Sequence, residues 1–233
     1  MRFPRSLASV GRDFEEAVTK IKFCGLRKPA DAAHAASLGA TYGGVIMTRS
    51  IRQVSADDAR EIFSAAPALQ RVGVVGRDPI SHILKTAERS ELDILQLHGN
   101  FTPEDCAQIR QEFDGELWCV LGIEETESRG HDSWKDLADS ADALVLDTAV
   151  RGKTGGTGRK FNWDNAAPQV SEMSREIPIV LAGGLNPENV ATAISTLHPA
   201  VVDVSSGVES SPGVKSHEMM TAFARAVLSA SIV

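Results

Sequence analysis

Cysteine is scarce in this sequence: the 233 residues contain three, Cys24, Cys106 and Cys119. They form no Cys-x-x-Cys pair and have no histidine cluster beside them, and the histidines show no ligand spacing with acidic residues. These absences argue against a disulfide framework and against a bound metal. We expect three reduced thiols, a cytoplasmic protein and no metal ion.

Positive charge and long apolar runs are also lacking. The chain has 24 Lys and Arg against 31 Asp and Glu, a net charge of −7, with no basic run, so we expect no nucleic-acid partner. Apolar stretches reach only about four to six residues, whereas about 18 are needed to span a bilayer, so we expect no membrane partner. Residues 11–16 are polar where a signal peptide would be apolar, so we expect no secretion signal.

Short Val-, Ile- and Leu-rich runs instead alternate with segments of helical character. Prolines such as Pro29 and Pro103 stand where such segments begin, a position that proline favours. The expected strands are 21–24, 42–47, 71–75, 94–97, 117–121, 143–147, 179–182 and 201–205. The expected helices are 29–38, 56–65, 79–90, 103–112, 134–140, 163–174, 187–196 and 216–228.

Eight such alternations predict an α/β fold, a single (β/α)8 TIM barrel over residues 19–233 with a short N-terminal extension at 1–18. A doubly wound open sheet fits less well, because it usually has five or six strands and a glycine-rich turn after the first. In a barrel the catalytic residues lie at the carboxyl ends of the strands. That rule selects the candidate site residues.

Asp147 and Cys24 are the candidates for acid–base chemistry. Asp147 ends an apolar strand at the rim of the core, where burial favours the protonated form of a carboxyl group and makes it a proton donor. Cys24 ends the first strand, where a thiolate near cations can act as a base. The alternatives are an aspartate that caps loop N–H groups and a cysteine that is a small buried apolar residue.

Glycines and serines follow the last two strands, in Ala182–Val190 and Asp203–Glu209. Barrels often bind phosphate at these two loops, where glycine lets the backbone approach and a helix N-terminus offers N–H groups. The residues predicted to bind phosphate are Gly183, Gly184, Ser206 and Gly207. The alternative is that these glycines only form turns.

Three further features point to the mouth of the barrel. Arg52 follows the second strand, where a guanidinium can hold a carboxylate in bidentate fashion, and His98 ends the fourth strand. A solvated arginine and a structural histidine are the alternatives. Residues 151–158 contain Gly-Lys-Thr, but Asp147 stands where a P-loop needs glycine. We expect instead a loop that closes on substrate, with Lys153 near an anionic group.

Seven strings occur in the chain in one order: KFCGL at 22–26, SIRQVS at 50–55, QLHG at 96–99, LVLDT at 144–148, GGTGRKFNW at 155–163, AGGLNPENV at 182–190 and DVSSGVESSPGVK at 203–215. From about Lys20 to its C-terminus the chain therefore resembles the phosphoribosylanthranilate isomerase family of tryptophan biosynthesis. The resemblance implies a barrel enzyme that carries out an Amadori rearrangement on phosphoribosylanthranilate without a cofactor or metal. It also implies roles for the candidate residues: Cys24 as general base, Asp147 as general acid, Arg52 on the anthranilate carboxylate, and Gly183, Gly184, Ser206 and Gly207 on the phosphate.

The chain departs from the family pattern at Gly76, Asn162 and Ser216, where the family usually has Asn, Asp and Asp. Two related barrels fit less well. The isomerase of histidine synthesis generally uses two aspartates, against Cys24 here, and indole-3-glycerol phosphate synthase uses Lys and Glu at its strand ends. A non-catalytic sugar-phosphate-binding barrel is a third alternative, which the presence of both Cys24 and Asp147 argues against. Both a monomer and a homodimer are compatible with the sequence.

Overall fold

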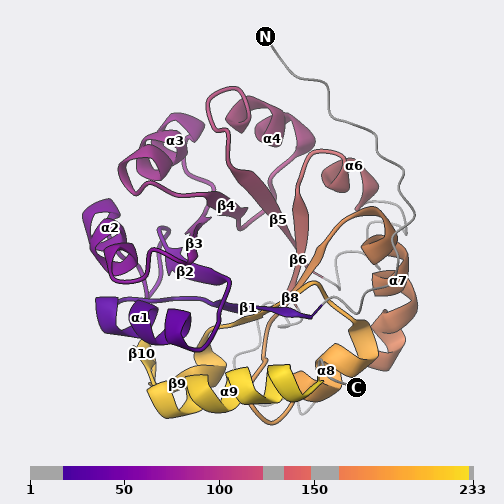
Figure 1. The fold of residues 1–233 in the computed structure, drawn as a ribbon. Coiled ribbons are helices and arrows are strands. Elements are labelled where there is room, and N and C mark those ends of the chain that lie inside the picture. Colours follow the sequence, from indigo (N-terminus) through magenta and orange to yellow (C-terminus); the bar gives the residue numbers. More distant parts are fainter. Residues whose placement is uncertain (1–17, 123–133, 148–162, 231–233) are drawn as a thin grey trace.

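The computed structural model describes residues 18–122, 134–147 and 163–230. Eight parallel strands form a closed barrel in the order of the chain, and β8 pairs with β1 (Figure 1). The predicted (β/α)8 barrel is confirmed. The strands are β1 (Lys20–Phe23), β2 (Tyr42–Ile46), β3 (Gln70–Val75), β4 (Ile94–Leu97), β5 (Glu116–Gly122), β6 (Ala143–Asp147), β7 (Ile179–Ala182) and β8 (Val201–Val204). The helices between and after them are α1 (Pro29–Ser37), α2 (Ala56–Ser64), α3 (Ile80–Arg89), α4 (Pro103–Ile109), α6 (Lys135–Ala138), α7 (Trp163–Glu176), α8 (Val190–Leu197) and α9 (His217–Ala230).

Side chains alternate between the two sides of the barrel wall, as they must along a strand. The outward-facing ones pack against the helices and make the larger apolar core. A second cluster fills the barrel interior and consists of Tyr42, Val72, Ile94, Trp118, Ala143, Val145, Val180 and Val201. Tyr42 and Ile94 begin their strands, so this cluster closes the amino end of the barrel. A cavity inside the barrel therefore opens at the carboxyl end.

Several helices begin where local chemistry favours a helix start. Ser55 precedes α2, and its side chain accepts a hydrogen bond from the Asp58 N–H while the Asp58 carboxylate accepts one from the Ser55 N–H. Thr102 and Asp105 form the same capping box at α4. These reciprocal bonds satisfy N–H groups that a helix leaves unpaired at its start.

Helix α8 starts later than predicted, at Val190 instead of Pro187. The side chain of Asn186 accepts hydrogen bonds from the N–H groups of Glu188 and Asn189, and Asn189 accepts one from the Asn186 N–H. This side-chain turn replaces the first helical turn, as asparagine often does.

The structure also contains elements that the sequence pattern did not indicate. A short 3-10 helix η1 (Ser206–Val208) and an antiparallel hairpin of β9 (Glu209–Ser211) and β10 (Val214–Lys215) follow β8. The predicted extension, apart from Val18, lies outside the described residues, as do the predicted closing loop with Lys153 and the family departure at Asn162. Within the described part of the chain no helix is long and apolar enough to cross a membrane.

Candidate active site

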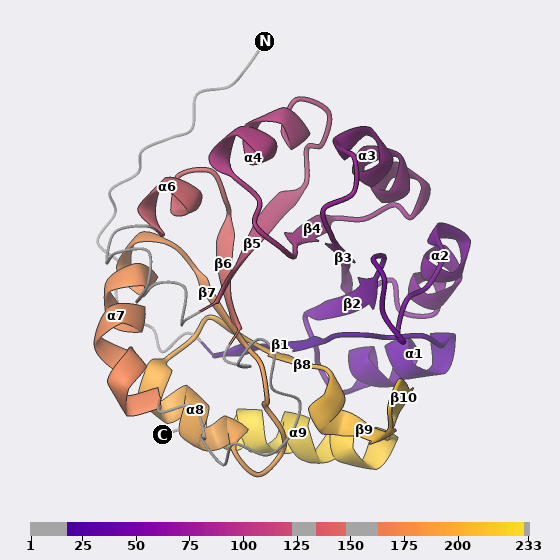
Figure 2. The same ribbon diagram turned by 180° about the vertical axis from the view of Figure 1, so that it is seen from behind.

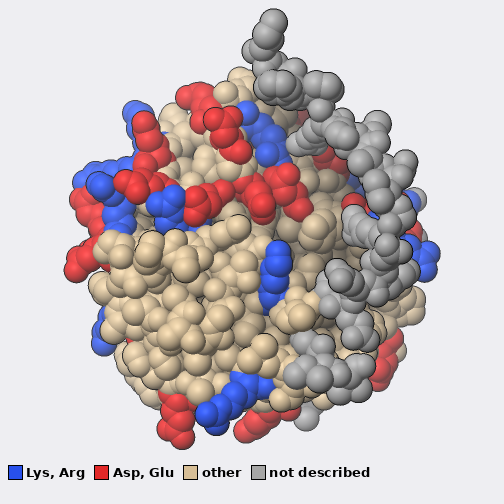
Figure 3. All heavy atoms as spheres, in the orientation of Figure 1, with Lys and Arg blue, Asp and Glu red and all other residues tan. Residues whose placement is uncertain are grey.

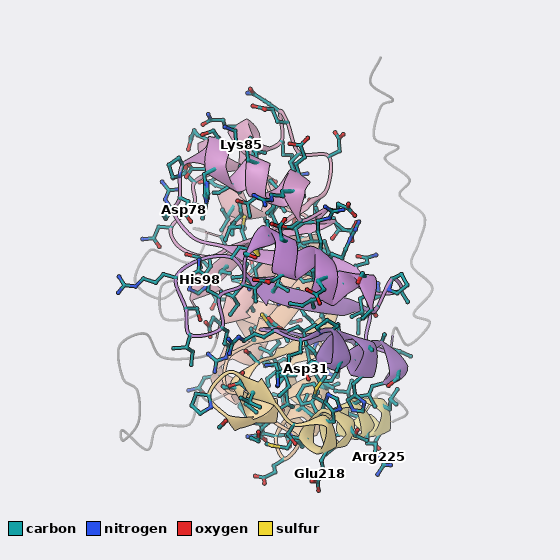
Figure 4. All side chains as sticks on the ribbon, turned by 90° about the vertical axis from the view of Figure 1, so that its left-hand side faces the viewer. Asp31, Asp78, Lys85, His98, Glu218 and Arg225 are labelled. Carbon is teal, nitrogen blue, oxygen red and sulfur yellow. The ribbon has the colours of Figure 1, made fainter. Side chains whose placement is uncertain are left out.

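The carboxyl ends of the strands, which face the viewer in Figure 2, carry residues that line a cavity of about 360 Å³. His98 lies at that end of the barrel, at the left in Figure 4. Six predicted site residues line the cavity: Cys24, His98, Asp147, Gly183, Gly184 and Ser206. Thus the structure brings together residues that span most of the sequence.

Arg52 and Gly207 are the two predicted site residues outside the lining. The Arg52 guanidinium pairs with Glu209, with Nε to Oε1 and Nη2 to Oε2 both at 2.7 Å. Glu209 also accepts hydrogen bonds from the Lys215 ammonium at 3.1 Å and from the Gly213 N–H at 3.0 Å. The hairpin β9–β10 therefore holds Arg52 beside the cavity.

This ionic cluster is buried: the side chains of Glu209 and Lys215 are 3% and 1% exposed. Burial alone would raise the pKa of Glu209, but the hydrogen bonds from Arg52 and Gly213 and the charge of Lys215 lower it to about 2. Burial lowers the pKa of Lys215, against the opposing effect of Glu209. The hydrogen bond with Glu209 raises the pKa of Arg52, so the arginine carries its charge at every relevant pH.

Gly25 makes room for this arrangement. A Cβ there would lie 2.8 Å from Cδ of Arg52 and 3.0 Å from Oγ of Ser205, and its φ of +72° is unfavourable for other residues. Glycine after Cys24 therefore allows the arginine from the next loop to cross the end of β1.

Cys24 is buried, with 6% exposure, at the base of the cavity. Its surroundings inside the barrel include Lys22, whose ammonium donates a hydrogen bond to Asp203 at 2.7 Å. Burial raises the pKa of the Cys24 thiol, while Lys22 opposes that effect and Asp203 adds to it. The thiol thus lies between charges of both signs.

Asp147 is the last residue of β6, three strands from β1 along the barrel wall. Its side chain is half-buried and lines the same cavity as Cys24. A carboxyl group and a thiol therefore reach one cavity from separate strands, an arrangement that suits an acid and a base acting on the same molecule.

The loops after β7 and β8 pack closely together. Gly183 and Gly184 have φ values of +87° and +67°, in the left-handed region that glycine tolerates. A Cβ on Gly207 would lie 1.9 Å from the carbonyl oxygen of Leu185, so only glycine fits there. Ser206 begins η1, and the first N–H groups of a helical turn have no partner within that turn. The geometry suits an anion held by backbone N–H groups.

Two departures from the family pattern fit their surroundings. A Cβ at Gly76 would lie 2.4 Å from Oγ1 of Thr48, which itself lines the cavity. The hydroxyl of Ser216 accepts a hydrogen bond from the Met219 N–H at the start of α9, which is the capping role that an aspartate would also fill. Both replacements leave Cys24 and Asp147 unchanged.

A larger hollow of about 870 Å³ lies at the amino ends of the strands. Arg71 pairs there with Asp93 at 2.9 Å and with Glu91 at 3.2 Å, and Arg60 also pairs with Glu91. Figure 3, which views this face, shows a band of acidic side chains with basic ones among them. Because five acidic residues and only two arginines line this hollow, and no thiol or imidazole does, the cavity at the other end is the better active-site candidate.

Four charged residues of the site were not predicted from the sequence: Lys22, Asp203, Glu209 and Lys215. The signal for the first two is a charge inside an apolar strand, where residues are normally apolar. The signal for the other two is Pro212-Gly213 between them, a pair typical of a turn. Gln96, buried and also lining the cavity, is a third polar residue within a strand.

Comparisons with known proteins point to one family of enzymes. The model of the N-(5'-phosphoribosyl)anthranilate (PRA) isomerase family matches residues 21–226. An N-(5'-phosphoribosyl)anthranilate isomerase of Synechococcus elongatus is 42% identical over 209 residues, which cover 87% of this chain and 93% of that protein.

Solved structures show the same fold. The phosphoribosyl anthranilate isomerase of Thermotoga maritima superposes with a TM-score of 0.78 at 32% identity, covering 91% of this chain and 99% of that one. A phosphoribosyl anthranilate isomerase in complex with reduced 1-(o-carboxyphenylamino)-1-deoxyribulose 5-phosphate gives a TM-score of 0.75 at 31% identity, with 91% and 99% covered.

Proposed function

Because this chain belongs to the N-(5'-phosphoribosyl)anthranilate isomerase family and is an isomerase of tryptophan biosynthesis, we propose that it acts by an Amadori rearrangement. The substrate is N-(5'-phosphoribosyl)anthranilate and the product is 1-(2-carboxyphenylamino)-1-deoxyribulose 5-phosphate. The observation that carries this scheme is the convergence of Cys24 and Asp147 on one cavity beside two glycine-rich loops.

Asp147 is the general acid. It protonates the ring oxygen of the ribose, and the bond between that oxygen and the anomeric carbon breaks as the nitrogen lone pair forms a protonated Schiff base. A half-buried carboxyl group at the cavity wall can deliver this proton with little competition from water.

Cys24 is the general base. Its thiolate removes the proton from the sugar carbon next to the Schiff base, and the electron pair left behind forms an enolamine. The enolamine then tautomerises to the ketone, so the product is an isomer of the substrate and no electrons leave the molecule. No cofactor is required by this scheme.

The two ends of the substrate are both anionic, which suits the two polar regions beside the cavity. The loops with Gly183, Gly184, Ser206 and Gly207 bind the phosphate. Glu209 occupies Nε and Nη2 of Arg52, so the Nη1 group remains for the anthranilate carboxylate. His98 contacts the substrate at the cavity rim.

Replacing the acid or the base tests the scheme. In an assay that generates phosphoribosylanthranilate in situ and follows its fluorescence decay, Asp147→Asn and Cys24→Ser should each lower kcat by at least about 10²-fold. Binding of the reduced product analogue, measured by calorimetry, should change by less than about threefold and so control for folding.

Wild-type turnover in either variant would remove that residue from the chemistry. A wild-type protein that binds a phosphate ligand without consuming phosphoribosylanthranilate would favour another sugar-phosphate barrel, such as the histidine-pathway isomerase or a non-catalytic binding barrel. The cytoplasmic location and the choice between monomer and homodimer stay predictions.

A further inference from the structure

A buried pair of opposite charges lies beside Cys24 inside the barrel. Lys22 lies on β1 two positions before Cys24, which follows the strand directly and continues its pairing with β8, so both side chains point to the interior. Lys22 is 0% exposed, and its Nζ lies 2.7 Å from Oδ2 of Asp203. The register of β1 on β8 pairs Lys22 with Asp203, so the wall of the barrel itself brings them together.

The buried Lys22–Asp203 ion pair is not expected to stabilise the fold. Taking two charges out of water costs several kcal/mol per ion, which is recovered only when all their polar atoms find partners. Within the described residues, Oδ1 of Asp203 and Oε1 of Gln96, a second residue of the cavity lining, are buried without a hydrogen-bond partner. The barrel interior closer to the amino end is apolar. We therefore expect the charged lysine, which is fully buried inside the barrel, to have a role other than packing.

The side chains of Lys22 and Cys24 meet over a glycine. A Cβ on Gly44 of the adjacent strand would lie 3.1 Å from Sγ of Cys24 and 3.2 Å from Cε of Lys22. The absence of a side chain at Gly44 thus lets the lysine and the thiol share one space, where the charge of the ammonium acts on the thiol.

Other charged or titratable groups act on the thiol or line the same cavity. Asp203 of β8, Lys215 of β10 and Arg52 after β2 act on the thiol. Arg49 after β2, His98 after β4 and Asp147 of β6 line the cavity. Burial raises the pKa of Cys24 most, Lys22 opposes this more strongly than any other group, and Asp203 reinforces it. Lys215 is already paired with Glu209, and Arg52 likewise.

We propose that Lys22 is a positioning residue for the reaction: its ammonium, fixed by Asp203, stabilises the thiolate of Cys24 against burial in the barrel. The proposal rests on the role of Cys24 as the base. In this scheme Lys22, the lysine of the KFCG string, supports the chemistry through Cys24. Asp203 is the counterion that holds Lys22 in place, and its own negative charge opposes ionisation of the thiol.

The test measures ionisation of Cys24 without substrate. The rate of alkylation by iodoacetamide is followed from pH 6 to pH 11, with the peptide that carries Cys24 quantified by mass spectrometry. In Lys22→Met the midpoint should rise by about one pH unit or more, so alkylation at pH 7 slows about tenfold. In Asp203→Asn the midpoint should fall. Lys20→Met, which removes an equal charge at the exposed start of the same strand, should match the wild type.

The alkylation midpoint of Cys24 should rise in Lys22→Met and fall in Asp203→Asn. A merely structural role of the pair would leave both midpoints unchanged or shift both in the same direction. A Lys22→Met profile that coincides with the wild type overturns the proposal. If Lys22→Met does not fold, the double variant Lys22→Met/Asp203→Asn is compared with Asp203→Asn: a higher midpoint supports the proposal and an equal one overturns it. An inactive wild type with shifted variants would refute the isomerase scheme and leave the coupling of Lys22 to Cys24 intact.

Discussion

At the scale of single residues, the site depends on a few charges held inside an apolar frame. Glu209 contacts two cations and a backbone N–H group at once. It is not a group that touches the reacting atoms, yet it fixes the direction of Arg52. A substitution of Glu209 should therefore affect both substrate binding and the stability of the fold.

Glu209 predicts a specific dependence of stability on pH. Its pKa is about 2 in the folded protein against an ordinary value of 4.5. Because the folded value is the lower one, the stabilisation is fully present above about pH 4.5 and is lost as the pH falls toward 2. The shift corresponds to at most about 3 kcal/mol. Urea unfolding from pH 6 to pH 2.5 should show a steeper loss for the wild type than for Glu209→Gln.

The same substitution should also weaken binding of the anthranilate carboxylate. We expect Glu209→Gln to raise KM about tenfold while kcat changes less than threefold, since the arginine loses its orientation and the acid and base remain. Exposed Glu188→Gln serves as the control. An unchanged KM would show that Arg52 does not need Glu209.

At the scale of elements, the approach of the loops after β7 and β8 shapes the proposed phosphate site. Gly207 of η1 touches the backbone at Leu185, and the turn formed by Asn186 and Asn189 holds that backbone in place. Neither loop can move aside by a simple rotamer change. The two loops therefore behave as one unit.

Gly207→Ala tests this unit. The added Cβ would meet the Leu185 carbonyl oxygen at 1.9 Å, so the loops must separate, at a cost of about 1–3 kcal/mol in the free energy of unfolding. Affinity for inorganic phosphate should fall at least about tenfold, measured by calorimetry. Gly39→Ala is the control for the added methyl group, because no atom lies within 4 Å of its would-be Cβ; its φ of +79° adds a backbone strain that Gly207 lacks. Equal phosphate affinity in both variants would contradict the proposed site.

At the scale of the whole molecule, the two ends of the closed barrel differ: side chains fill the amino end, and the cavity lies at the carboxyl end. Trp118 is 2% exposed inside the barrel, and its ring packs edge-to-face on Tyr42 at 4.9 Å between centroids. These rings fill the amino end where a channel would otherwise begin. The substrate can therefore enter only among the loops at the carboxyl end.

Trp118→Ala should lower the free energy of unfolding by about 3–5 kcal/mol, because it leaves a cavity in the barrel interior. Trp118→Phe keeps most of the ring and should cost clearly less. Guanidinium unfolding of both variants measures the difference. A loss below about 1 kcal/mol for Trp118→Ala would mean that the interior collapses around the gap.

The sequence by itself determined the fold and the principal site candidates. Its eight apolar runs predicted all eight barrel strands because period and spacing are local properties, and Cys24 and Asp147 are recognisable from their places at strand ends. The helix starts were less certain, as α8 shows, because an asparagine turn competes with the helix there.

Only the tertiary structure decided the electrostatics of the site. Lys22 and Asp203 lie 181 positions apart, and Arg52 and Glu209 lie 157 apart, so nothing local marks them as pairs. They meet because closure of the barrel sets β1 against β8 and brings the β9–β10 hairpin over the end of β2. A charge interaction depends on distance in space and on burial, and both quantities exist only once the barrel has closed.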